Sequence, residues 1–139
     1  MKTRSLNLFF VLILMVFMIS GCKNAKMQEY YSVQDNYVSA EGIVSHIVFS
    51  EDRQEMYIEF SDLTPTFDDT CFKIVGKNLD IIRMQDIDTE IQLGDKLEFM
   101  TAPHYFGDGY VMPIVSLTID GNMVLEFEEG VSNFLDWLK

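Results

Sequence analysis

The sequence predicts a small, mainly β domain with one short internal helix and a C-terminal helix. Short runs of β-branched and aromatic residues alternate with turn clusters, and Asp120-Gly121 is the strongest hairpin signal among them. Residues 22–139 supply 118 positions, which is enough for one domain. Beyond Cys22 only one cysteine remains, Cys71, so this domain is expected to fold without an internal disulfide.

The first half of the domain is expected to begin with a β-hairpin. Residues 38–49 are rich in β-branched side chains, and Gly42 within this run indicates a bulge or tight bend. The polar cluster at 50–54 predicts a turn into the alternating run at 55–60. A loop should follow over 61–69, where Pro65 bars regular pairing.

The second half should contain a short helix followed by further strands. Asn78 is a candidate N-cap for a helix over 79–84. Residues 128–139 place apolar side chains at helical spacing, with acidic residues at the start and Lys139 at the end. The remaining strands are expected at 71–75, 96–100, 110–118 (interrupted by Pro113) and 123–127.

This element order resembles the OB-fold, a partly open five-stranded barrel. The resemblance rests on three strands, a helix and two further strands, and on the turn Leu93-Gly94-Asp95-Lys96-Leu97 that leads into the fourth strand. It covers about residues 38–127 and implies a small OB-like barrel of five to six strands. A small β-sandwich or another small barrel accounts for the same pattern.

The first 22 residues resemble the leader of a bacterial lipoprotein precursor. Lys2 and Arg4 precede an uncharged apolar run of 14 residues, Leu6 to Ile19, which is shorter than the roughly 20 residues that a membrane-spanning helix needs. Ile19-Ser20-Gly21-Cys22 then matches a lipobox. The resemblance implies cleavage after Gly21 and lipidation of Cys22, here called the lipid anchor.

The leader divides the chain into three parts: a removed signal peptide (1–21), a lipidated N-terminus and tether (22–37) and the barrel domain (38–139). The basic end should stay in the cytoplasm, which places the domain at the extracytoplasmic face of the cell membrane. Lys23, rather than an aspartate, follows Cys22, which favours the outer membrane in a cell that has two membranes.

The chain is strongly acidic after the leader. All 22 acidic residues but only eight of the ten basic residues lie beyond position 21, so this part has a formal net charge of −14. Because proteins bind the phosphate backbone by neutralising it with lysine and arginine, this charge predicts that nucleic acid is not a partner.

No catalytic or metal-binding constellation stands out, so no catalytic residue, metal or cofactor is assigned. His46 and His104 lie on different elements, and no cysteine pair accompanies them. The loop at 102–109 collects aromatic and polar side chains and is the candidate ligand-facing segment, with the loop at 61–69 as the next choice. Its candidate residues are His104, Tyr105, Phe106, Asp108 and Tyr110.

These observations predict a membrane-anchored, extracytoplasmic lipoprotein that acts as a non-enzymatic binding or interaction module. Its expected contacts are the membrane, through Cys22, and a protein partner or small ligand at the envelope. Two alternatives stay open: a metal-dependent or carboxylate-based enzyme at the envelope, and a structural subunit of an envelope complex. The sequence specifies neither the ligand nor the oligomeric state.

Overall fold

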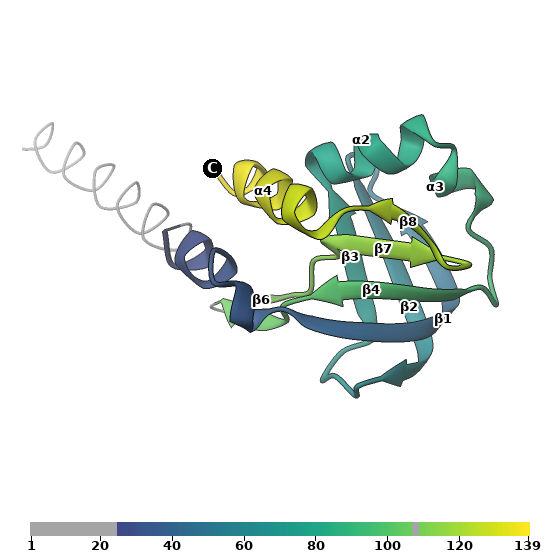
Figure 1. Ribbon diagram of the computed structural model, residues 1–139, viewed down its shortest axis with the longest axis horizontal. Helices are drawn as coiled ribbons and strands as arrows, with labels where there is room; N and C mark the ends of the chain where they lie inside the picture. The colour runs from purple at the N-terminus through teal and green to yellow at the C-terminus, as the bar shows by residue number, and fades with distance from the viewer. Residues whose placement is uncertain (1–24, 107–108) are drawn as a thin grey trace, which may run out of the picture.

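The computed structural model describes residues 25–106 and 109–139. In this part of the chain, six antiparallel strands form one sheet in the order β3-β2-β1-β4-β7-β8, and β5 pairs with β6 in a separate ribbon (Figure 1). The strands are β1 (Val38–Phe49), β2 (Glu55–Thr64), β3 (Cys71–Val75), β4 (Lys96–Thr101), β5 (His104–Phe106), β6 (Gly109–Val111), β7 (Ser116–Ile119) and β8 (Asn122–Leu125).

Helices lie at one end of the sheet and beside it. Helices α2 and α3 connect β3 to β4, and α4 follows β8 at the end of the chain (Figure 1). Among the described residues, no helix is long and apolar enough to cross a membrane. The helical segments are residues 25–31, η1 (Gln34–Asn36), α2 (Gly76–Met84), α3 (Ile87–Glu90) and α4 (Phe127–Trp137).

The sheet curls into a barrel that closes at β3. Strand β1 pairs with both β2 and β4, and register shifts at Gly42 and Ser45 bend it, as the glycine predicted. The amide of Lys73 donates to the carbonyl of Met112 at 3.0 Å, and the amide of Ile114 donates to the Lys73 carbonyl at 2.8 Å. The mainly β, OB-like barrel with an internal and a C-terminal helix is therefore confirmed.

Several elements differ from the prediction. Strand β2 continues through Thr64, because residues 61–64 keep pairing with the bulged part of β1. The strand expected at 110–118 is divided between β6 and β7, with Pro113 in the interruption. Asn78 does not cap a helix: it lies inside α2 and is buried.

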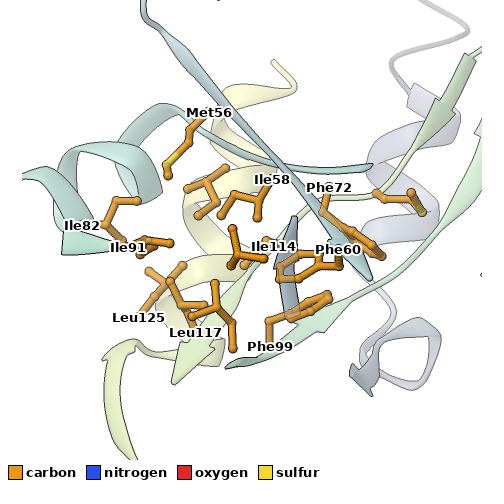
Figure 2. Packing of buried hydrophobic residues seen from close by; sticks show 14 of the residues in the cluster. Met56, Ile58, Phe60, Phe72, Ile82, Ile91, Phe99, Ile114, Leu117 and Leu125 are labelled. Carbon is orange, nitrogen blue, oxygen red and sulfur yellow. The ribbon is translucent and has the colours of Figure 1, made fainter. Parts of the chain in front are cut away.

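The main core fills the barrel. Inward-facing residues of β2 and β3 alternate with outward-facing ones, so Met56, Ile58 and Phe72 lie inside (Figure 2). Phe60 and Phe99 stack with centroids 4.8 Å apart, and Phe72 meets both rings edge-on. This packing leaves the outward-facing side chains of the same two strands free to form a surface site.

A second core cluster joins residues 25–37 to α4. Tyr31 is fully buried, and its ring meets Phe134 edge-on at 4.9 Å. Its carbonyl accepts a hydrogen bond from the Tyr37 hydroxyl at 2.9 Å. From residue 25 onward, the stretch expected as a tether therefore packs against the domain.

Helix α4 also packs closely against α2 and the start of β7. Gly130 lies so near this strand that a Cβ atom placed on it would be 1.7 Å from the Val115 carbonyl oxygen. The buried Asn78 amide donates to the Gly130 carbonyl at 2.8 Å and its oxygen accepts from Asn133 at 3.0 Å. A glycine and a buried amide therefore fix the position of α4.

Candidate functional site: the outer face of β2 and β3

The outer face of β2 and β3 brings together an aromatic, a cationic and several acidic side chains. Tyr57 of β2 lies directly opposite Lys73 of β3, and Glu59 lies opposite Cys71. Directly opposed residues point to the same side of a sheet, so these four side chains share one surface. We call this surface the β2–β3 face.

A cavity of about 280 Å³ opens on the β2–β3 face. Since pockets for drug-sized ligands measure about 300–1,000 Å³, this volume suits a smaller molecule. A larger groove of about 570 Å³ lies between residues 25–32 and α4, where mostly small and polar side chains line it. The smaller cavity is the better candidate because an aromatic ring and opposite charges converge on it. Its lining residues are Tyr57, Asp69, Cys71, Lys73 and Met112.

Lys73 is the cation of the site and is held from two sides. Its Nζ atom lies 3.9 Å from Glu55 Oε1 and 4.6 Å from the centroid of the Trp137 ring. Only 19% of the side chain is exposed. Burial lowers the pKa of Lys73 because it disfavours the charged form, and the Glu55 carboxylate opposes this shift.

Tyr57 presents the aromatic ring of the site in a fixed orientation. Its hydroxyl donates a hydrogen bond to Glu55 Oε2. This bond to the carboxylate, together with burial and the negative charge of Glu55, raises the pKa of Tyr57 to about 12. Tyr57 is therefore a neutral hydrogen-bond donor at physiological pH. Its hydrogen bond to Glu55 fixes the hydroxyl end of the ring.

Asp69 and Cys71 form the rim on the β3 side. Asp69 Oδ1 accepts hydrogen bonds from the backbone amides of Thr70 at 2.6 Å and Cys71 at 3.1 Å, which fixes the carboxylate. Burial raises the pKa of the half-buried Cys71 thiol, and the nearby charges of Asp69 and Glu59 add to the shift. Because the thiolate is the reactive form, Cys71 is an unreactive lining residue at neutral pH.

None of the described side chains of the candidate loop at 102–109 lines this cavity. His104 stacks on Tyr30, with ring centroids 4.2 Å apart, so it faces the helical segment 25–31. Tyr105 pairs with Tyr110 across the β5–β6 ribbon through the backbone. The side chains of Tyr105, Phe106 and Tyr110 lie outside the described part of the chain, as do all of Asp108 and Cys22.

The residues expected from the sequence lie in or next to the loop at 102–109, and Lys73 was not among them. The alternation of β3 predicts that Lys73 faces outward, as any polar strand residue would. Its partial burial depends on Trp137 and Met112, which are far away in the sequence. Within residues 25–106 and 109–139, no three histidine, cysteine or acidic side chains are placed to share a metal ion.

Comparisons with known proteins show similarity of fold only. No family model matches the chain, and no curated protein matches it. Among solved structures, the Stn1–Ten1 complex of S. pombe aligns with a TM-score of 0.42 and 10% identity over 72% of this chain and 66% of that one, just under two thirds.

Two similar structures are single-stranded DNA-binding proteins by name. A small single-stranded DNA-binding protein of Mycoplasma pneumoniae aligns with a TM-score of 0.42 and 11% identity, over 63% of this chain and 96% of that one. The mitochondrial single-stranded DNA-binding protein Rim1 of S. cerevisiae aligns with a TM-score of 0.35 and 13% identity, over 62% of this chain and 96% of that one.

The names of these structures differ from the functional expectation drawn from the sequence. The prediction of a binding module without nucleic-acid partners does not agree with these neighbours, which include proteins named for single-stranded DNA binding. The net charge behind that prediction describes the whole surface, whereas binding depends on the groups at one face. At this level of identity the similarity concerns the fold alone. It does not identify a ligand for this chain.

Proposed function

We propose that the β2–β3 face binds an unstacked nucleobase, supplied by a single-stranded nucleic acid or by a free nucleoside. The observation that carries this proposal is the cavity in which Tyr57, Lys73 and Asp69 converge. A nucleobase is a planar ring with hydrogen-bond donors and acceptors on its edge. The three side chains offer a ring, a donor and an acceptor, which is the complementary set.

Each side chain has a distinct role in this arrangement. The Tyr57 ring provides a stacking surface, an interaction that contributes about 1–3 kcal/mol per base. The ammonium group of Lys73 can donate to a ring nitrogen or a carbonyl oxygen of the base. Asp69 can accept from an amino or imino group, because only its Oδ1 is engaged by the backbone amides. Met112 and Cys71 supply polarisable apolar contacts beside these groups.

The acidic surroundings restrict which part of a nucleotide can enter. Glu55, Glu59 and Asp69 surround the single cation Lys73, so this face repels phosphate more than it attracts it. Base stacking and edge hydrogen bonds should therefore supply the affinity, with at most one phosphate contact at Lys73. Such a site should have a shallow salt dependence: less than about threefold weaker binding between 50 and 200 mM salt.

Fluorescence anisotropy with a labelled oligothymidylate of about 12 nucleotides tests the proposal, with unlabelled nucleosides as competitors. Tyr57→Ala should weaken binding about 5- to 150-fold through loss of the stacking surface, whereas Tyr57→Phe should bind nearly as well as wild type. Lys73→Met should weaken binding, and Lys96→Met, a matched change in the exposed pair with Glu41, should have no effect.

The competitors distinguish the two sources of the base. Displacement of the oligonucleotide by nucleosides indicates a pocket for the isolated base, and its absence indicates that a strand is required. Absence of binding by both ligands at millimolar concentration would overturn the proposal. Equal binding by wild type and Tyr57→Ala would overturn it as well.

The role of Cys22 as the lipid anchor, and the extracytoplasmic location that it implies, form a separate proposal. The support is the leader pattern that ends in Ile19-Ser20-Gly21-Cys22. These residues lie outside the described part of the chain. The test of the β2–β3 face does not depend on the outcome for the anchor.

A further inference from the structure

We infer that Trp137, on the C-terminal helix and outside the barrel, is a positioning residue for the β2–β3 face, a role that rests on the base-binding function proposed above. The indole ring holds the ammonium group of Lys73 at the wall of the cavity. Helix α4 therefore completes a ligand site whose other side chains come from the barrel. Trp137 thereby sets the position from which Lys73 contacts a ligand.

The contact between Lys73 and Trp137 is a cation–π interaction. Lys73 Nζ lies 4.6 Å from the ring centroid, within the roughly 6 Å over which the ring attracts a cation. Glu55 Oε1 lies 3.9 Å from the same nitrogen and provides the second restraint. A lysine side chain loses rotamer entropy when it is fixed, so a lysine that is already held before binding lowers this cost.

Trp137 is itself fixed by its neighbours, which lets it position another residue. Its ring stacks on Phe134 with centroids 5.8 Å apart and an interplanar angle of 18°. Gly76, at a φ of +57°, passes close beside the ring, and a Cβ atom there would lie 3.1 Å from it. A Cβ atom at 76 would require the indole to shift by a few tenths of an ångström, and the positive φ itself disfavours residues other than glycine. The ring is thus held between α2 and its own helix.

The fluorescence of Trp137 is a direct reporter of ligand binding, because Trp137 is the only tryptophan in the chain. A base that binds the ammonium group of Lys73 beside the indole should change the surroundings of the indole. Binding of an unlabelled nucleoside or oligothymidylate should therefore change the fluorescence of wild-type protein. Lys73→Met should shift the emission without any ligand.

A double-mutant cycle separates positioning from a purely structural role. In the otherwise wild-type protein, Trp137→Leu should raise the dissociation constant of the labelled oligothymidylate about 2- to 30-fold, the range expected for a cation–π contact. In the Lys73→Met background the same change should have no effect. Trp137→Phe keeps a ring at this place and should lie between wild type and Trp137→Leu.

The outcomes are distinct. An equal effect of Trp137→Leu in both backgrounds would overturn the positioning role while leaving base binding intact. Failure of wild type to bind any ligand would remove the base-binding proposal and this inference together. Urea unfolding shows whether each variant is folded. If Trp137→Leu does not fold, the affinity of Trp137→Phe tests the positioning role, because this variant preserves most of the packing against Phe134.

Discussion

The substitution Gly130→Ala tests the close approach of α4 to the barrel. A Cβ atom at position 130 would lie 1.7 Å from the Val115 carbonyl oxygen and 2.7 Å from its carbon. Carbon and oxygen atoms normally approach to about 3.3 Å, so α4 would have to retreat by roughly 1.5 Å. The obstacle is backbone on both sides, so no side-chain rotation can relieve the overlap.

Three effects determine how Gly130→Ala changes the free energy of unfolding. Overpacking of this kind costs about 1–3 kcal/mol. Retreat of α4 also breaks the buried 2.8 Å bond from Asn78 to the Gly130 carbonyl, at a cost of about 1–3 kcal/mol. Alanine gains about 1 kcal/mol over glycine within a helix. The expected net loss in the free energy of unfolding is therefore about 3 kcal/mol.

Urea unfolding followed by far-UV circular dichroism measures this loss. Ser132→Ala is the matched control, because Ser132 lies on the exposed side of the same helix and its replacement should change stability by less than about 0.5 kcal/mol. If Gly130→Ala is as stable as wild type or more stable, helix propensity outweighs the contact, and the placement of α4 against Val115 is wrong.

Three further predictions concern other parts of the chain. The pKa of Tyr57 rises from 10.0 to about 12 on folding, so its stabilising contribution is complete below pH 10 and is lost as the pH rises through 12. Tyr57→Phe should flatten the dependence of the free energy of unfolding on pH in this range. An unchanged pH dependence in urea titrations of this variant would contradict the shift. Tyr31→Ala should cost about 3–5 kcal/mol and speed amide exchange in residues 25–31, whereas unchanged exchange would show that this helix does not depend on the contact with Phe134. Cys22→Ala should abolish incorporation of labelled palmitate and cleavage of the leader, and a lipidated variant would refute the lipobox.

Local patterns were sufficient to predict most of the barrel. The run at 38–49 corresponds to β1, and the Asp120-Gly121 turn joins β7 to β8. These features depend on alternation and turn chemistry, which neighbouring residues determine. Asn78 shows where such reasoning fails: an asparagine before an apolar run looks like a cap, but its amide bonds to Gly130, 52 residues away. Tertiary packing determines the role of this residue.

The packing of residues 25–31 and the candidate site were less predictable for the same reason. Residues 25–31 carry no sustained apolar period, and only burial of Met27 and Tyr31 against the domain reveals that they pack. Lys73 looks like an ordinary outward-facing strand residue. Its partial burial arises from the indole of Trp137, which the sequence places 64 positions later. Side chains that converge from distant segments leave no local signal.

The closure of the barrel at Lys73 has a consequence for the kinetics of the site. The backbone of this one residue exchanges two hydrogen bonds with Met112 and Ile114, while its side chain forms part of the cavity wall. Local opening of the barrel along this seam would break the cavity apart. A base bound in this cavity should therefore stabilise the closed seam and slow hydrogen exchange at the Lys73 amide.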